Sequence, residues 1–146
     1  MNINSLNMPK DFLEDVSSKR LSRKIGSWEL IQNVDFFGEH LETELGEIFD
    51  TEEAIIYNTR NLVDAFKPNG FYGEDAPELQ GPSGIPDIVD FSKIVNFAIS
   101  GDGAPFCFDF RDDLYAPSII WWDDTYWRII APTYSEFINL FRVRNT

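Results

Sequence analysis

The sequence predicts an α+β fold, in which a twisted antiparallel sheet has its helices packed mainly on one face. Apolar residues recur with helical spacing at 9–24, at 51–66 and again after residue 133. Apolar runs of strand length lie between these segments, and short turn sequences join three of them in succession. The chain has 146 residues, of which 43% are hydrophobic, so we expect residues 1–146 to form a single domain with a substantial core.

The N-terminal part of the chain predicts a helix followed by a strand. Residues 9–24 are expected to form the helix, because Pro9 suits a first helical position and basic residues gather toward the C-terminal end. Residues 27–33 alternate in the way that a strand requires. The apolar face of the helix is expected to hold Phe12, Leu13 and Val16.

The middle of the chain predicts a short strand, a long helix and a long loop. The strand is expected around 47–49 and the helix at about 51–66, where Asp50 and Glu53 form a D-x-x-E pattern typical of a helix N-terminus. Residues 68–87 are rich in proline and glycine, so a long surface loop is expected there.

The C-terminal third predicts a meander of strands followed by a helix. The stretch FCFDFR at 106–111 alternates strictly, so its three phenylalanines are expected on one face of a strand. Thr133 and Glu136 match a T-x-x-E capping box. The strands are expected at 93–100, 106–111, 118–122 and 126–131, and the apolar face of the helix at Tyr134, Phe137, Ile138 and Phe141.

Negative charge is the strongest global feature of the sequence. The formal net charge is −13, and no Lys or Arg stands between Lys24 and Arg60. An acidic surface repels phosphates, so no direct binding of DNA or RNA is expected, whereas a basic protein partner would be attracted and steered. The simpler alternative is a surface that keeps the protein in solution. The acids in this gap are Glu29, Asp35, Glu39, Glu42, Glu44, Glu47, Asp50, Glu52 and Glu53.

The sequence favours a cytoplasmic protein that makes no membrane contact. Its start has neither a basic region nor an apolar region of the kind found in signal peptides. No apolar run approaches the ~20 residues that span a bilayer. Cys107 is the only cysteine, which excludes an internal disulfide and fits a reducing compartment.

The stretch GDGAPFCFDFRDD at 101–113 resembles a reaction site, because it holds four aspartates and the only cysteine. It lacks the regularly spaced oxygen ligands of a calcium loop. Asp112 and Asp113 could meet Asp123 and Asp124 at one edge of the sheet, but acidic turns are ordinarily solvated, so no metal is expected there either. Cys107 would need His40, the only histidine, as its base, and a cysteine between phenylalanines more often packs in a core.

No catalytic residue and no cofactor are therefore expected. The sequence contains no phosphate-binding glycine loop of the Walker or G-x-G-x-x-G type, and no C-x-x-C or H-E-x-x-H motif. A small hydrolase that uses Asp109, Asp112 and Asp123 at an acidic edge of the sheet stays open as an alternative.

Several segments of the chain, taken in order, are similar to the SUKH superfamily, also called the Smi/Knr-like domains. The similarity covers about residues 46–141, and the order and spacing of the segments carry it. Ahead of it, MPKDFL at 8–13 is similar to the L-P-x-x-[YF] stretch of the family, but the Asn-Gly turn is missing. The similar segments are EIFDTEEAI (47–55), Gly101-Asp102-Gly103, Phe106 to Arg111, Pro117 to Trp122, Trp127 to Ala131 and Thr133 to Ile138.

The resemblance implies an α+β binding protein rather than an enzyme. Bacterial members often look like immunity proteins, which are made beside a secreted polymorphic toxin and bind its toxic domain in the producing cell. Such toxins are frequently nucleases or nucleic-acid deaminases with basic surfaces. We therefore expect an immunity protein, or antitoxin, that neutralises a cognate toxin through an acidic surface. The alternative, implied by fungal relatives, is a regulatory or signalling protein-interaction module of the cell-wall regulator type.

The expected contact surface combines acidic residues with aromatic anchors. Carboxylates would meet the cationic residues that normally hold nucleic acid, and Trp and Tyr are enriched in interface hot spots. Adjacent Trp121 and Trp122 face opposite sides of a strand, so at least one of them is expected in the core. The residues expected to bind the partner are Glu39, Glu42, Glu44, Glu47, Asp50, Glu53, Trp122 and Tyr126.

Overall fold

The computed structural model describes residues 1–18, 28–66, 83–85, 88, 90–123 and 126–143. The strands are β1 (Asn2–Ile3), β2 (Leu6–Asn7), β3 (Trp28–Leu30), β4 (Glu44–Ile48), β5 (Ile94–Ser100), β6 (Pro105–Asp109), β7 (Ser118–Asp123), β8 (Tyr126–Ala131) and β9 (Phe141–Val143). The helices are α1 (Lys10–Ser18), α2 (Glu52–Phe66) and α3 (Tyr134–Ile138).

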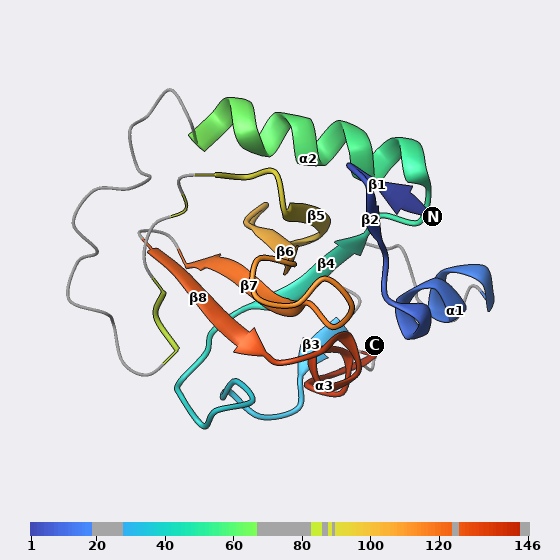
Figure 1. Ribbon diagram of the computed structural model, residues 1–146. Helices are drawn as coiled ribbons and strands as arrows, with labels where there is room; N and C mark the ends of the chain where they lie inside the picture. The colour runs from blue at the N-terminus through green and yellow to red at the C-terminus, as the bar shows by residue number, and fades with distance from the viewer. Residues whose placement is uncertain (19–27, 67–82, 86–87, 89, 124–125, 144–146) are drawn as a thin grey trace.

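The predicted α+β class is confirmed. One antiparallel sheet has the order β8-β7-β6-β5-β4-β3-β9, and β1 and β2 form a separate small hairpin (Figure 1). Strands β6, β7 and β8 form the predicted meander. Phe106 of β6 stands opposite Trp121 of β7, and Trp122 of β7 stands opposite Trp127 of β8. The meander matches the prediction because each of its strands is bounded by a strong turn signal.

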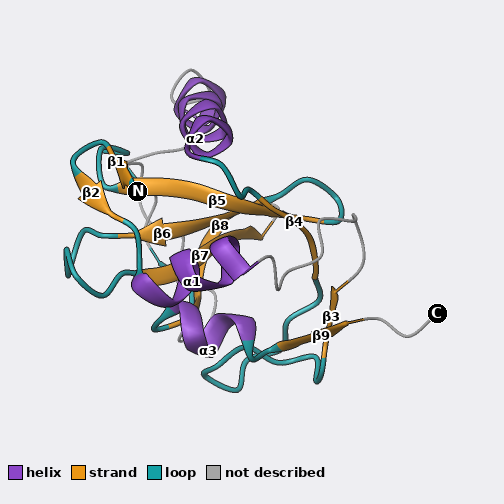
Figure 2. Ribbon diagram, turned by 90° about the vertical axis from the view of Figure 1, so that its right-hand side faces the viewer, coloured by secondary structure: helices purple, strands orange, loops and turns teal. Residues whose placement is uncertain are grey.

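Apolar clusters cover both faces of the curled sheet. The larger cluster joins α1, α3 and one face of the central strands, where the ring of Phe12 meets Phe97 and Phe108 edge-on at centroid distances of 5.6 and 5.2 Å. The smaller cluster contains Leu62 of α2 and Cys107 of β6. Helices α1 and α3 therefore lie on one face and α2 lies on the other (Figure 2).

The alternation predicted for β6 is confirmed, and both of its faces are buried. Phe106, Phe108 and Phe110 belong to the larger cluster, and Cys107 belongs to the smaller one. Asp109 stands opposite Ile94 and is only 9% exposed. Its carboxylate accepts hydrogen bonds of 2.9 and 2.8 Å from the guanidinium of Arg111, which satisfies its charge at the end of the strand.

The prediction that Phe141 continues the last helix is wrong. Helix α3 ends at Ile138, and Phe141 lies in β9, opposite Leu30 of β3. Strand β3 would otherwise present unpaired backbone groups at a sheet edge, and pairing with β9 satisfies them. The cap itself is confirmed in part, because the side chain of Thr133 accepts a hydrogen bond from the backbone N–H of Glu136.

Helix α2 begins at the residues predicted, and the hydroxyl of Thr51 accepts a 3.1 Å hydrogen bond from the N–H of Ala54 there. One further local prediction needs correction. The end of the predicted surface loop is buried, because Gly84 pairs with Arg128 of β8 and Ser83 is 1% exposed. Residues 19–24 of the predicted first helix, and 68–82 and 86–87 of the predicted loop, lie outside the described residues.

The N-terminal hairpin was not predicted. Asn4 and Ser5 join β1 to β2 with φ angles of 52° and 65°, the left-handed conformation that two-residue hairpin turns require. The hairpin places Ile3 and Leu6 in the larger cluster. Its signal is weak in the sequence because two-residue strands have almost no periodicity.

Candidate functional site: an acidic cleft lined by tryptophans

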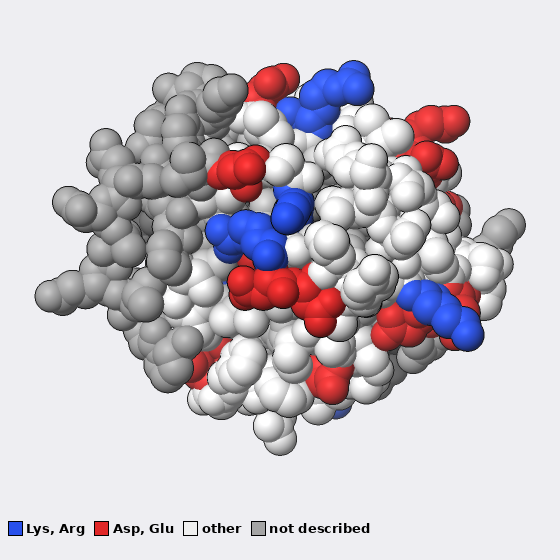
Figure 3. Space-filling view, viewed as in Figure 1, with Lys and Arg blue, Asp and Glu red and all other residues white. Residues whose placement is uncertain are grey.

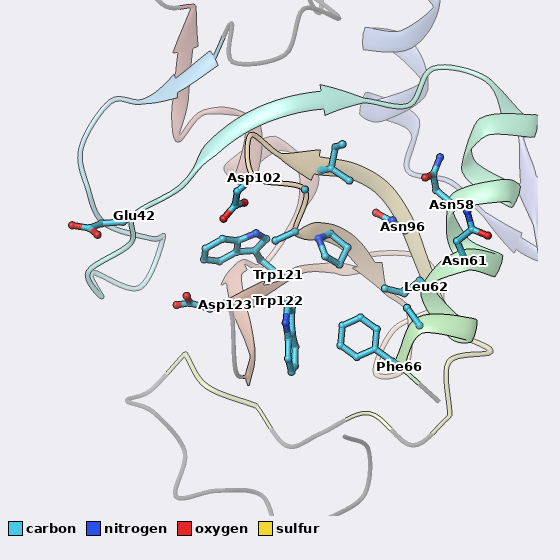
Figure 4. A pocket seen from close by; sticks show the side chains of 15 residues that line it. Glu42, Asn58, Asn61, Leu62, Phe66, Asn96, Asp102, Trp121, Trp122 and Asp123 are labelled. Carbon is cyan, nitrogen blue, oxygen red and sulfur yellow. The ribbon is translucent and has the colours of Figure 1, made fainter. Parts of the chain in front are cut away.

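A cleft of about 750 Å³ lies between α2, the turn that joins β5 to β6, and the end of β7 (Figure 4). The turn is Gly101–Gly103, and Gly103 adopts a φ of 91° there, which favours glycine. Trp121 of β7 stands opposite Phe106, near the start of β6, and β7 continues for two more residues to Asp123. Trp121 and Trp122 both line the cleft. The curl of the sheet thus brings the end of a buried strand up to the surface.

Three carboxylates line the cleft. Glu42 comes from the β3–β4 connection, and its exposed side chain lies 3.2 Å from His40. Asp102 lies in the β5–β6 turn and accepts a hydrogen bond from the hydroxyl of Ser100. Asp123 accepts a 3.1 Å hydrogen bond from Nη1 of Arg128. No Lys or Arg is among the described residues that line the cleft, and Arg128 compensates only Asp123, so the carboxylates of Glu42 and Asp102 give the cleft an excess of negative charge.

The aromatic side chains give the cleft an apolar wall. Trp122 is half-buried and packs edge-on against Phe66 of α2 and Trp127 of β8, with centroid distances of 4.8 and 5.4 Å. Trp121 is 4% exposed and stacks against Phe106. The two tryptophans belong to different clusters, which confirms that they face opposite sides of β7.

Three asparagines line the end of the cleft beside α2 (Figure 4). Asn58 and Asn61 come from the helix, and Asn58 donates a 2.8 Å hydrogen bond to the carbonyl oxygen of Ala54. Asn96 comes from β5, where its backbone N–H donates a 3.0 Å hydrogen bond to the hydroxyl of Thr59. The side-chain oxygen of Asn96 is buried and has no hydrogen-bond partner.

A smaller hollow of about 370 Å³ adjoins the cleft and shares Glu42 and Asp102 with it. Glu29 and Glu44 also line it, so four carboxylates meet there. The side chain of Glu44 occupies the space that a Cβ on Gly101 would need, which explains the glycine at this position. The cleft and the hollow together form one acidic region around the β5–β6 turn.

The structure brings together only some of the predicted partner-binding residues. Glu42 and Trp122 line the cleft, Glu44 lines the hollow, and the hydroxyl of Tyr126 donates to Asp123 at 3.3 Å. Neither the cleft nor the hollow is lined by Glu39, Glu47, Asp50 or Glu53. Sequence reasoning missed the asparagines altogether and assigned Asp102 only to a turn.

On the face shown in Figure 3, the acidic side chains do not form one continuous patch: they are scattered, and basic side chains lie among them. The net charge of −13 belongs to the whole chain, whereas the region around the β5–β6 turn concentrates carboxylates locally.

The described aspartates considered for a hydrolase do not converge, and Asp124, which was considered for a metal, lies outside the described residues. Asp109 lies opposite Ser118 at one end of the β6–β7 pair, and Asp123 is five residues farther along β7, about 16 Å away at ~3.3 Å per residue. Asp112 lies in the β6–β7 loop near Asp109. Within the described part of the chain, no group of three His, Cys, Asp or Glu side chains could hold a metal ion.

Cys107 and His40 occupy different environments. Cys107 is fully buried, and its burial, with a smaller contribution from the charge of Asp109, raises the pKa of the thiol well above its ordinary value. The thiol is therefore protonated near neutral pH, where it cannot act as a nucleophile. The side chain of His40 is 70% exposed in the β3–β4 connection.

Fold and site define an α+β domain with an acidic cleft walled by tryptophans. Among the described residues, no helix is both long and apolar enough to cross a bilayer. Comparison with models of known families, with curated proteins and with solved structures gives no match. A function is therefore inferred from the cleft and from the sequence resemblance.

Proposed function

We propose that this protein is a cytoplasmic immunity protein of the SUKH type, which binds a cognate toxin domain and blocks its basic surface. The observation that carries the proposal is the cleft. Its lining contains the carboxylates of Glu42, Asp102 and Asp123 beside two tryptophans, and it contains no described Lys or Arg. Carboxylates and aromatic rings at a concave site are the groups that bind cationic side chains.

The proposed inhibition is competition with nucleic acid. A nuclease or deaminase holds its substrate with Lys and Arg side chains that neutralise phosphates. Carboxylates at the rim of the cleft would occupy the same cations and exclude the phosphates from them. Because the contact is between proteins, this activity needs no catalytic group and no cofactor on the immunity protein.

The overall charge supports rapid capture of a basic toxin. Complementary charges raise association rates toward about 10⁸–10⁹ M⁻¹s⁻¹ at low salt, compared with about 10⁵–10⁶ without steering. An immunity protein benefits from speed, because free toxin damages the cell that makes it. The net charge of −13 supplies such steering for any partner with a basic surface.

The proposal is tested by co-expressing this protein with the toxin that the gene next to its own would encode. Wild-type protein is expected to restore growth when the toxin is induced, and purified protein is expected to inhibit the toxin in vitro at a 1:1 ratio. The double variant Asp109→Asn and Asp112→Asn examines the hydrolase alternative without changing a carboxylate of the cleft, and it should keep growth rescue if the protein acts only by binding. Absence of rescue, combined with binding to a host protein, would favour the regulatory module instead.

A further inference from the structure

Two adjacent phenylalanines form an exposed aromatic tip on the β3–β4 connection. Phe36 is 49% exposed and Phe37 is 45% exposed, and their rings pack edge-on against each other at a centroid distance of 5.3 Å. The connection lies at the lower edge of the molecule in Figure 1, below β8. Single exposed apolar side chains are ordinary on protein surfaces, whereas large apolar groups that gather in one place mark interaction sites. The aromatic tip is therefore a candidate contact surface.

The backbone of the tip is held in one conformation. Val34 pairs with His40 across its base, and the N–H of Asp35 donates a 2.8 Å hydrogen bond to the carbonyl oxygen of Glu39. Gly38 supplies a φ of 83°, and its N–H donates to the carbonyl oxygen of Asp35 at 3.1 Å. A segment that is already ordered loses little conformational entropy when it binds, so the tip is prepared for contact.

Strand β8 anchors the tip from outside. The backbone N–H of Phe36 donates a 3.0 Å hydrogen bond to the carbonyl oxygen of Ile130, and the buried carboxylate of Asp35 pairs with Arg128. A buried ion pair is often no more stabilising than apolar residues of the same volume, because desolvation offsets the attraction of the charges. Its effect here is on position, since it fixes the backbone beside the two phenylalanines while their rings stay exposed.

The charges of the connection restrict what can cover the tip. Glu39 lies two residues after Phe37, and the side chain of Glu42 is 80% exposed. No Lys or Arg stands between Lys24 and Arg60 in the sequence. A second copy of this chain would bring like carboxylates together, and an anionic membrane surface would be repelled for the same reason. A protein surface with Lys or Arg side chains would be attracted.

We propose that Phe36 and Phe37 enter an apolar pocket of the partner protein whose rim carries Lys or Arg side chains. The two rings would fill the pocket, and Glu39 and Glu42 would pair with the cations of the rim. Glu42 also lines the cleft, so a single partner would contact both the tip and the cleft. This inference rests on the proposed function, and it assigns the part of the toxin surface that the connection recognises.

Binding to the toxin encoded by the neighbouring gene measures the contribution of the tip. Phe36→Ser with Phe37→Ser should weaken the complex at least about thirtyfold, because aromatic anchors carry much of the binding free energy of an interface. Leu114→Ser with Tyr115→Ser is the matched control, since these side chains are 47% and 90% exposed in the β6–β7 loop, and it should leave the Kd unchanged. Urea denaturation checks that each variant folds, and Phe37→Ser alone is used if the first double variant does not.

A small host molecule tests the chemistry of the tip without the toxin. Amino-β-cyclodextrin has an apolar cavity that admits a phenyl ring, and its rim carries amines that are charged near neutral pH. With the full chain labelled with ¹⁵N, we expect saturable shifts of the backbone N–H signals of Phe37 and Gly38, at a Kd in the range of about 1–10 mM. Neutral β-cyclodextrin should bind the tip about fivefold more weakly, because it lacks the charges.

Charge variants locate the source of this preference. Glu39→Gln with Glu42→Gln should make the amino and the neutral cyclodextrin bind about equally, because the carboxylates beside the tip are gone. Glu14→Gln with Asp112→Asn makes the same change in net charge on α1 and in the β6–β7 loop, and it should keep the preference.

Equal binding of the two cyclodextrins to wild-type protein, or shifts confined to residues outside the connection, would overturn the inference. If wild-type protein protects cells and the Phe36→Ser, Phe37→Ser variant binds the toxin with an unchanged Kd, the immunity function stands and the aromatic tip does not. If wild-type protein fails to protect, the toxin proposal fails, and the cyclodextrin comparison decides the tip. Dimerisation in analytical ultracentrifugation or binding to phosphatidylcholine vesicles, if lost in Phe37→Ser, would also overturn the inference, because the occupant would be a second copy or a membrane.

Discussion

The guanidinium of Arg128 on β8 lies 2.7 Å from the carboxylate of Asp35, and the two side chains are only 4% and 0% exposed. The other carboxylate oxygen of Asp35 accepts the N–H groups of Phe37 and Glu39, at 2.8 and 3.0 Å. Arg128 also donates to Asp123 at the cleft. The buried guanidinium of Arg128 therefore links the β3–β4 connection to the end of β7 at the cleft. The same connection also contains Glu42.

Removing the carboxylate of Asp35 should destabilise the protein strongly. In Asp35→Ala, Asp123 is the one described carboxylate left beside Arg128, and the backbone N–H groups of Phe37 and Glu39 lose the Asp35 acceptor. Breaking a buried pair in this way costs about 3–5 kcal/mol, because it leaves a buried charge without compensation. Urea denaturation followed by tryptophan fluorescence measures the loss in the free energy of unfolding.

An exposed ion pair of the same sheet gives the control. Arg142 lies 3.3 Å from Glu29, with side chains that are 59% and 35% exposed, so water screens their attraction. Arg142→Gln should cost no more than about 1 kcal/mol. Equal losses for Asp35→Ala and Arg142→Gln would show that the Asp35–Arg128 pair does not organise the connection.

Burial of Cys107 should make the protein less stable at alkaline pH. Burial, and then the charge of Asp109, raise the pKa of the folded thiol, whereas in the unfolded chain the pKa is about 8.5. Below that pH both states keep the proton, so the thiol has no effect on the pH dependence. Above it only the unfolded chain releases the proton, and the free energy of unfolding should fall by about 1.4 kcal/mol per pH unit.

Chemical denaturation between pH 7 and pH 10 measures this slope, and Cys107→Ala is the matched control. The variant should be less stable near neutral pH because it leaves a cavity, but it should lack the part of the alkaline slope that the thiol causes, so the two proteins should approach each other toward pH 10. Other groups titrate in both proteins, so the difference between the two slopes is the informative quantity. Identical slopes would mean that Cys107 ionises in the folded protein as readily as in the unfolded chain.

The C-terminal meander could be predicted from the sequence because local signals and tertiary structure agree there. Strict alternation in β6 and clear turns around β7 and β8 mark the strand ends. Phe141 shows the opposite case, since its spacing matches the helical face while its backbone is needed to pair with β3. Long-range pairing of this kind leaves no mark in local periodicity.

The candidate site could be predicted only in part for a similar reason. The charge pattern pointed to Glu42 and Glu44, and the aromatic content pointed to Trp122. Asn96 carries no sequence signal, because its place at the cleft depends on the packing of β5 against α2. The curl of the sheet, which sequence periodicity does not specify, decides which acids meet.

Gly46 should be required for the close approach of β4 and β5. A Cβ at this position would lie 2.7 Å from the carbonyl oxygen of Ser100, a backbone atom that cannot move without shifting the strand. Gly46→Ala should therefore destabilise the protein by about 1–3 kcal/mol, as measured by thermal or urea unfolding.

Gly101 provides the comparison, because a Cβ there would meet the side chain of Glu44 instead of backbone. That side chain can rotate away, so Gly101→Ala should cost less than Gly46→Ala while displacing a carboxylate from the hollow. If Gly101→Ala proved the more damaging of the two, rotation of Glu44 would not relieve the contact.

Charge reversal around the β5–β6 turn should slow the proposed capture of a basic toxin domain. Glu42→Lys with Glu44→Lys replaces carboxylates in the acidic region, whereas Glu14→Lys with Asp112→Lys makes the same change in net charge on α1 and in the β6–β7 loop. Stopped-flow association at low salt should slow about tenfold or more for the first pair and by less for the second. At 1 M salt the Debye length falls to about 3 Å, so the difference between the pairs should nearly vanish. Equal rates for the two pairs at low salt would place the contact surface elsewhere, because only a local field distinguishes variants with the same net charge.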